Sequence, residues 1–267
     1  MPAIFQIKLS HLDYVDFFPG ADFHLGSPQC DEEMIQHYVS FIKRNDQAFW
    51  VGVGDWTNNN ITGSAGTPYE DILSPRKQIE RAVELFWPIK DKGWGVIAGN
   101  HNHRTRRAVG LDPDEWIARE LDVPYWGDSA FINIIIKNKS WSIYAHHCTG
   151  GGRTAGGKLN AIHRLGDTAP VVDFIIGAHV HVAGISGSRY ASMRGPNSPK
   201  KENKLFLNTR RTIQVGSTLN WEGSYAETKA MPPAVKELVW LRLKGLSGGK
   251  DSKTIGREEF EYHIFSG

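Results

Sequence analysis

Histidine, acidic and amide side chains gather at the ends of five apolar segments in this sequence. The stretch GVIAGNHNHR at 95–104 shows the pattern: an apolar run stops at a glycine, and alternating Asn and His follow. Imidazole nitrogens and carboxylate or amide oxygens bind transition metals, and His also carries protons near neutral pH. The residues of this kind are Asp22, His24, Asp55, Asn100, His101, His146, His147, His179 and His181. Their positions predict a metal site or a proton-transfer site.

The spacing of these residues favours the metal site. Asp-x-His at 22–24 and His-x-His at 179–181 put two donors on the same side of an extended segment, because side chains alternate with a period of two. A single Asp or His at a strand end is more often a cap or a turn residue. Five strand ends together could surround a small volume with seven ligands, whereas one zinc site needs only four. Two metals that share a carboxylate would use all seven.

The elements that must position these residues are short strands with helices between them. Ser27-Pro28 and Ser74-Pro75 each predict a helix start, since Ser caps a helix and Pro is tolerated at its first position. Asp112 is predicted to cap a third helix. Strand-like segments 131–136 and 140–147, joined by a polar turn at 137–139, predict a hairpin, and three further strand-like segments follow in the tail. The pattern predicts an α/β layered fold with additional antiparallel strands.

Composition bounds the classes of function. The chain has 267 residues, a net charge of only +2 and two cysteines, neither in a CxxC motif. These values argue against a polycation and against a disulfide framework, and they favour a reducing compartment. We find no secretory signal and no stretch approaching the ~18 apolar residues of a membrane span. We expect one domain over 1–267 with an excursion loop at about 187–211, in a cytoplasmic protein with no membrane partner.

The five segments, in chain order, carry the motifs ADFHLG, GDWTNN, GNHNH, AHHC and GAHVH. These resemble the DxH, GDxx[DN], GNH[DE], lone-His and GHxH motifs of the calcineurin-like metallophosphoesterase family. The resemblance covers about residues 15 to 185. It implies a four-layer α/β/β/α sandwich, with two mixed β-sheets flanked by helices.

The resemblance also implies a role for each site residue. One metal would be held by Asp22, His24 and His181. The other would be held by Asn100, His179 and one histidine of the 146–147 pair, and Asp55 would bridge the two. Strand position favours His146, which comes first after the apolar run WSIYA. His101 would act on the substrate as the catalytic residue. Asn102 stands where the family usually has a carboxylate that orients this histidine.

Mixed His, Asp and Asn ligands suit two divalent ions of Mn, Fe, Zn, Co or Ni better than Ca or Mg. Two such ions, roughly 3.5–4 Å apart, support attack on phosphorus by a bridging hydroxide in line with the leaving group. The sequence therefore predicts a phosphoester hydrolase, with phosphodiesters favoured and Mn²⁺ as a suitable ion. Alternatives are a nuclease acting on DNA or RNA, a phosphomonoesterase, and a non-catalytic scaffold that uses the same fold for protein binding.

Three candidate substrate contacts follow the motifs: Arg104, His147 and Arg153. Arg104 belongs to HRTRR, which could equally be a solvated helix face. Arg153 belongs to GGGRTAGGK, which is not a P-loop because Leu159 stands where Ser or Thr belongs. That glycine-rich stretch could approach a phosphate or simply form a turn before a helix. The basic clusters at 200–204 and 208–211 could contact nucleic acid phosphates.

Overall fold

The computed structural model describes residues 3–64, 66–152, 154–169, 171–193, 205–228, 230, 232–245 and 259–266. Its strands are β1 (Ala3–Lys8), β2 (Tyr14–Gly20), β3 (Ala48–Val53), β4 (Gly93–Ile97), β5 (Ser129–Ile136), β6 (Lys139–His146), β7 (Phe174–Gly177), β8 (Ala183–Ser192), β9 (Phe206–Ser217), β10 (Glu237–Lys244) and β11 (Phe260–Ser266). Its helices are α1 (Glu32–Arg44), α2 (Pro75–Phe86), the 3₁₀ helix η1 (Trp87–Lys92), α3 (Asn102–Val109), α4 (Pro113–Glu120), α5 (Ala155–His163), α6 (Leu165–Thr168) and α7 (Tyr225–Thr228).

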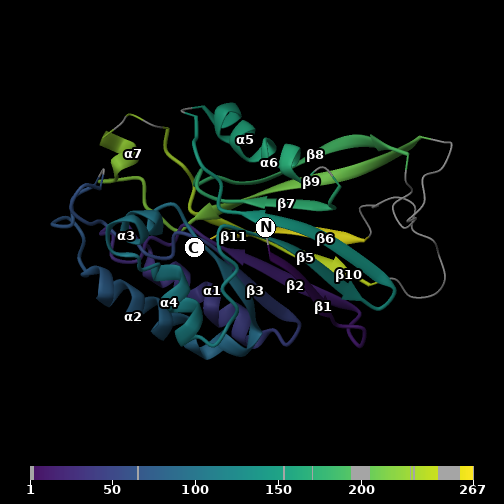
Figure 1. Ribbon diagram of the computed structural model, residues 1–267, viewed down its shortest axis with the longest axis horizontal. Coiled ribbons are helices and arrows are strands. Elements are labelled where there is room, and N and C mark those ends of the chain that lie inside the picture. Colours follow the sequence, from purple (N-terminus) through teal and green to yellow (C-terminus); the bar gives the residue numbers. More distant parts are fainter. Residues whose placement is uncertain are drawn as a thin grey trace.

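The strands form one curled mixed sheet in the order β1-β5-β6-β7-β9-β10-β2-β3-β4, with β8 paired to β9 and β11 paired to β10 (Figure 1). Among the described residues, only a short ladder joins its two halves, in which Glu237 and Leu238 pair with Ser217 and Gly216. The two predicted sheets are therefore continuous through this ladder. The predicted α/β class, with helices flanking the sheet, is confirmed.

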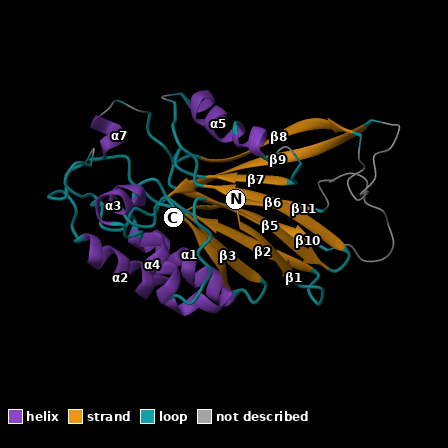
Figure 2. Cartoon of the chain, viewed as in Figure 1, coloured by secondary structure: helices purple, strands orange, loops and turns teal. Residues whose placement is uncertain are grey.

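Helices cover both outer faces of the curled sheet. Helices α1 and α4 contact the half that contains β3 and β4, and α5 contacts the half that contains β7 and β9 (Figure 2). One apolar cluster runs from α1 through Val51 to Ile132 and Trp141 on the other half. A smaller cluster joins Ile162 of α5 to the outer face of β6 and β7. The ends of the strands are therefore where residues from the two halves of the sheet can form a common site.

Local signals account for two of the three predicted helix starts. Ser74 precedes Pro75 at the first position of α2, and the Asp112 side chain caps α4 through the backbone N–H of Asp114. The prediction for Ser27-Pro28 was wrong. Those residues form a turn closed by a bond from the Cys30 N–H to the Ser27 carbonyl, and α1 is capped four residues later by Asp31. An Asp that can accept from the third residue of the helix makes the better cap.

The predicted hairpin is confirmed, with Lys137 at its turn in the left-handed region (φ 49°). The predicted excursion loop was wrong at both ends, because β8 and β9 pair along residues 183–192 and 206–215. The middle of the excursion, 194–204, lies outside the described residues, and with it the whole basic cluster at 200–204. No helix in the described part of the chain combines the length and apolarity needed to cross a bilayer.

Candidate metal centre

Backbone geometry turns the motif residues inward where the strands end. Five of them have a left-handed backbone: Asp22 (φ 53°), His24 (47°), Asp55 (53°), His179 (69°) and His181 (54°). This conformation costs a non-glycine residue on the order of 1–3 kcal/mol, and such strain concentrates at functional sites. Backbone hydrogen bonds between the motifs hold it, such as that from the His24 N–H to the Asp55 carbonyl at 3.1 Å. The fold therefore maintains an unfavourable backbone to bring these side chains together.

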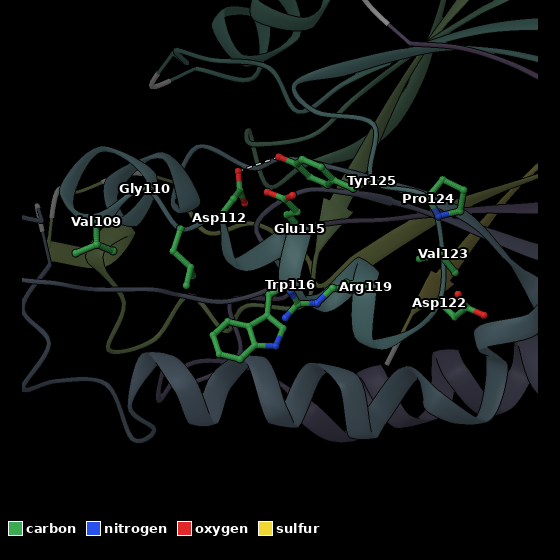
Figure 3. Close-up of a pocket in the computed structure, with 11 residues that line it drawn as sticks. Val109, Gly110, Asp112, Glu115, Trp116, Arg119, Asp122, Val123, Pro124 and Tyr125 are labelled. Atoms are coloured by element: carbon green, nitrogen blue, oxygen red, sulfur yellow. Dashed lines mark hydrogen bonds between the residues drawn. The ribbon is translucent and has the colours of Figure 1, made fainter.

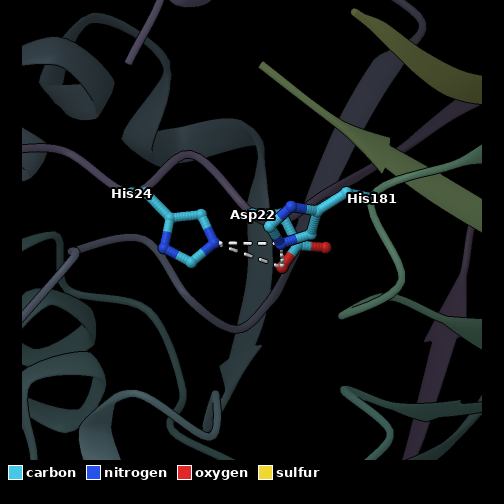
Figure 4. Close-up of side chains that lie close together, drawn as sticks. All are labelled: Asp22, His24 and His181. Atoms are coloured by element: carbon cyan, nitrogen blue, oxygen red, sulfur yellow. Dashed lines mark hydrogen bonds and ion pairs between the residues drawn. The ribbon is translucent and has the colours of Figure 1, made fainter. Parts of the chain in front are cut away.

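The first group of donors is Asp22, His24 and His181 (Figure 4). The Nε2 atoms of the two histidines lie 3.2 Å apart, and they lie 3.6 and 3.3 Å from Oδ1 of Asp22. Asp22 and His24 are buried, whereas a third of the His181 side chain is exposed. Burial alone would raise the pKa of the Asp22 carboxyl, but His181, His24 and His147 outweigh it and lower the pKa. The carboxylate is thus in the form that binds a cation.

The second group is Asp55, His147 and His179, with Asn100 beside it. Nε2 of His147 lies 3.0 Å from Oδ2 of Asp55 and 2.9 Å from Oδ1 of Asn100. The other ring nitrogen, Nδ1, lies 2.7 Å from the Val53 carbonyl. A carbonyl oxygen only accepts, so Nδ1 carries the proton and Nε2 of a neutral ring presents a lone pair. Metal-binding histidines are commonly oriented by such a bond.

Asp55 lies between the two groups. Its carboxylate reaches the donors His147 and His179 on one side and His24 and His101 on the other. Burial alone would raise the pKa of Asp55, but the neighbouring histidines, His147 foremost, hold it well below its usual range. Gly99 allows this approach, because a side chain there would collide with the backbone nitrogen and carboxylate of Asp55. A central buried carboxylate fits the bridging position that the resemblance implied.

These donors fit divalent metal ions. Two ligands at about 2.1 Å from one ion lie roughly 3.0–3.4 Å from each other, close to the spacings within both groups. Oδ1 of Asp22 is buried and without a hydrogen-bond partner among the described residues, as is Nδ1 of His24. Lone pairs that face one another at these distances repel unless a cation lies between them. The donor set of imidazole, carboxylate and amide is one that transition metals accept.

His101 faces the gap between the groups. Its backbone N–H donates to Oδ1 of Asp55 at 2.9 Å, and its Nε2 lies 4.0 Å from Oδ2 of the same residue. Its Nδ1 donates to the Asn58 carbonyl at 2.7 Å, which leaves Nε2 directed into the site. Burial lowers the pKa of His101 to about 3, so the ring is neutral near pH 7 until an anion lies beside it.

The residue expected to orient His101 does not do so. Asn102 is fully buried and accepts a hydrogen bond from the Thr57 hydroxyl at 3.4 Å, away from the His101 ring. The orienting group is the backbone carbonyl of Asn58 instead. Asn102 is the first residue of α3, and the helix turns its side chain back toward the loop after β3.

The structure places His147, rather than the expected His146, among the metal donors. Trp141, Ile143 and Ala145 of β6 point into the core between the sheet halves, and alternation puts residue 147 on that side. His146 shares the opposite face with Tyr144, and its Nδ1 accepts from the Cys148 N–H at 2.7 Å. The prediction favoured His146 because it comes first after the apolar run. It overlooked the alternation of side chains along the strand, which places residue 147 on the same face as Trp141, Ile143 and Ala145.

Arg104 is the only arginine of HRTRR that the structure directs toward the site. Its Nη1 donates to the Asn60 side chain at 2.9 Å, and its charge acts on Asp55. Arg106 pairs with Asp128 and Asp112 at 3.2 and 3.6 Å, and Arg107 is exposed on α3. The solvated-helix interpretation thus holds for the last two arginines. Arg153 lies outside the described residues, and Thr154, which follows it, caps α5.

Two cavities lie near these elements. The smaller, about 160 Å³, is lined by the donors Asn100 and His147 together with His103, Asp128 and His146. The larger, about 780 Å³, is formed by α4 and its flanking loops (Figure 3). There the Tyr125 hydroxyl donates to Asp112 at 2.8 Å. The smaller cavity borders the metal centre on the side of Asn100 and His147, whereas the larger one belongs to a different part of the surface.

Sequence reasoning missed several supporting residues. The Ser217 hydroxyl at the end of β9 donates to the Asp22 carbonyl at 2.9 Å. The buried Asp114 accepts from the Gly99 N–H at 2.8 Å and so holds the turn that carries Asn100. Burial, together with Asp112, raises the pKa of Asp114 well above its usual range. Ser217 and Asp114 are distant in sequence from the motifs they support, and a single sequence carries no signal for them.

No family model and no curated protein matches this sequence. Solved structures with a similar fold include vacuolar protein sorting 29 from Cryptosporidium parvum (13% identity, 96% of this chain and 100% of that chain, TM-score 0.45). They also include calcineurin-like phosphoesterase YfkN from Bacillus subtilis (12%, 95% and 90%, TM-score 0.46) and a protein serine/threonine phosphatase from Saccharomyces cerevisiae (8%, 100% and 84%, TM-score 0.40). At identities this low, any functional assignment depends on the residues of the site.

Those residues carry the resemblance. All five motifs converge on one volume, from the strand ends at which the sequence put them. This convergence is what the resemblance to the calcineurin-like metallophosphoesterases implied.

Proposed function

We propose that this protein is a phosphoester hydrolase that depends on two divalent transition-metal ions. One observation carries the proposal: seven donor residues form two groups that share the buried carboxylate of Asp55. A non-catalytic scaffold has no need for such a set, because the strained backbone and the buried carboxylates cost stability. When bound, two such ions activate water and neutralise the charge that develops on the phosphoryl oxygens.

The chain's own residues would have the following roles. One ion would be held by Asp22, His24 and His181, and the other by Asn100, His147 and His179, with Asp55 between them. The Val53 carbonyl would keep Nε2 of His147 available as a ligand, since it holds the proton on Nδ1.

His101 and Arg104 are the proposed substrate contacts. A bound phosphoryl group beside His101 would raise its pKa, so that Nε2 could hold a proton and deliver it to the leaving oxygen. Nδ1 cannot take this role, because it is bonded to the Asn58 carbonyl. The Arg104 guanidinium would bind a phosphoryl oxygen, for which its planar array of donors is suited.

Phosphodiesters are the favoured substrate class. A diester carries one negative charge, and a monoester about two near neutral pH. Arg104 faces the site, whereas Arg106 is already paired with Asp128 and Asp112. One arginine beside two metal ions suits a substrate with a single negative charge better than a substrate with two negative charges. A nuclease acting on DNA or RNA would be one form of this activity, and the arginines at 210 and 211 alone do not favour it.

The test compares a generic aryl phosphodiester with its monoester, on metal-stripped protein re-supplied with Mn²⁺. We expect turnover that requires Mn²⁺ and a kcat/KM that is higher for the diester. His37→Ala is the matched control, because His37 is an exposed histidine on α1 and should retain full activity. A higher kcat/KM for the monoester would move the assignment to phosphatase. No turnover of either ester by protein with bound metal would contradict the proposal.

A further inference from the structure

The loop after β3 holds both proposed substrate contacts. Its residue Asn58 accepts the Nδ1 proton of His101 on its backbone carbonyl at 2.7 Å. Two residues later, the Asn60 side chain accepts from Nη1 of Arg104 at 2.9 Å. Between them, Asn59 has a left-handed backbone (φ 48°), and its side chain donates to the His101 carbonyl at 3.0 Å. The position of this loop therefore sets the positions of both His101 and Arg104.

One carboxylate, Asp71, anchors the loop. Its Oδ1 accepts from the side-chain amides of Asn58 and Asn60 at 2.7 and 2.9 Å. Its Oδ2 accepts from the Asn60 backbone N–H at 3.3 Å and from Nε2 of Gln78 at 2.8 Å. Gln78 is fully buried on α2 and itself accepts from the Asn59 N–H at 2.8 Å. Asn58, Asn59 and Asn60 are thus each tied, directly or through Gln78, to Asp71.

An acidic residue suits position 71 because an ionised carboxylate only accepts hydrogen bonds. An ionised carboxylate offers about four acceptor sites, and four N–H donors converge on it here. Hydrogen bonds to a charged group are roughly twice as strong as neutral ones. Three consecutive asparagines would otherwise be free to bond their own backbone in alternative turns. Asp71 selects one arrangement of the loop.

We propose that Asp71 is a positioning residue that orients His101 and Arg104 through the loop Asn58–Asn60. The inference rests on the proposed function, because it assigns the contacts of that same site. Asp71 acts at a distance from the reacting atoms: it bonds the loop, and the loop bonds the two side chains. Displacing a proton donor by about 1 Å can cost on the order of a hundredfold in rate.

The first test varies the leaving group. In the Mn²⁺-loaded enzyme, Asp71→Ala should lower kcat roughly tenfold to a hundredfold for a phenyl ester, whose leaving oxygen needs a proton. For a 4-nitrophenyl ester, a much better leaving group, the loss should be several times smaller. KM should rise for both esters through Arg104. Glu70→Ala, an exposed neighbour in the same loop, is the control and should match the wild type. Equal losses of kcat for both esters would overturn the inference.

A double-mutant cycle tests whether Asp71 acts through His101. Groups that act as a unit are non-additive. In the His101→Ala background, Asp71→Ala should therefore cause no further loss of kcat that depends on the leaving group. Additive losses would overturn the inference. If His101→Ala alone has no effect on either ester, the proposed function of His101 fails, which is distinguishable from a failure of Asp71.

A readout on the metal-free protein is independent of turnover. The bonded Nδ1 proton of His101 should give a downfield imidazole NMR signal, assigned by its absence in His101→Ala. This signal should be lost or exchange-broadened in Asp71→Ala and retained in Glu70→Ala. Asp71→Asn keeps one acceptor oxygen and should be intermediate, and it replaces Asp71→Ala if the alanine variant does not fold. A signal unchanged in both Asp71 variants would overturn the inference.

Discussion

Nε2 of His147 lies 3.0 Å from Oδ2 of Asp55, both side chains buried. Burial alone would lower the pKa of His147, but the carboxylates of Asp55 and Asp22 outweigh it and raise the pKa to about 10. In the metal-free protein a proton therefore occupies the place that a metal would take. The stability this proton contributes is complete below the ordinary pKa of 6.5 and is lost as pH rises through about 10.

The competition between proton and metal predicts pH-dependent affinity. Binding a metal to His147 displaces one proton, so the apparent metal affinity should rise about tenfold per pH unit at pH values below about 10. Calorimetric titration with Zn²⁺ in two buffers of different ionisation enthalpy measures the released protons. His147→Gln should remove this dependence. A slope near zero in the wild type would contradict the placement of His147 as a ligand.

The adjacent pair His146 and His147 allows a matched comparison. His147→Ala removes a donor of the second group, and the protein should retain about half of its bound metal and little activity. His146→Ala removes a ring on the opposite face of β6 and should retain full metal content. Metal content by elemental analysis and Mn²⁺-dependent turnover decide between them. The reverse result would restore His146 as the ligand.

The shared carboxylate predicts the behaviour of Asp55→Asn. The amide keeps the shape of the side chain but loses the charge that can bridge two ions, so turnover should fall at least a hundredfold. The backbone bond from His101 to Oδ1 can persist, so the fold should be maintained. Circular dichroism, metal content and turnover are the measurements. Full activity with both ions retained would show that the site is assigned wrongly.

Asp114 predicts a pH-dependent change in stability. Burial and Asp112 raise the pKa of the Asp114 carboxyl in the folded protein. The folded state is therefore not penalised by this group below the ordinary pKa of 3.8, and it is destabilised increasingly as pH rises above 3.8. Asp114→Asn keeps an acceptor for the Gly99 N–H and removes the ionisable group. The variant should raise the Tm of the metal-free protein at pH 8 by several degrees, and by less at pH 5. Thermal unfolding at both pH values measures this, and a lower Tm at pH 8 would contradict it.

The sequence predicts those site residues whose positions are marked by their neighbours in the chain. Asp22, His24, Asp55, His179 and His181 lie at strand ends that apolar runs and glycines mark, and the structure brings all of them together. Parallel strands bring their ends to a common edge, so this convergence follows from topology. Their left-handed backbone carries no sequence signal of its own, since none of the five is a glycine or is followed by one.

The remaining contacts depend on tertiary structure. Alternation along β6 puts His146 and His147 on opposite faces, but both faces carry apolar residues, so tertiary structure decides which face lies toward the metal centre. Asn58–Asn60 meet Asp71, eleven or more residues later in the chain, and Gln78 of α2 only in the folded structure. The outer parts of the predicted excursion loop pair as strands because β8 and β9 support each other. Such pairings depend on distant partners, and local propensity does not specify them.

The most direct test of the two-metal centre is titration of metal-stripped protein with Mn²⁺, followed by electron paramagnetic resonance and by turnover of an aryl phosphodiester. Two ions that share Asp55 should be spin-coupled. We predict two bound Mn²⁺ per chain, a coupled spectrum, and turnover that appears only with the second ion. Uncoupled ions, or full turnover with a single ion bound, would contradict the account.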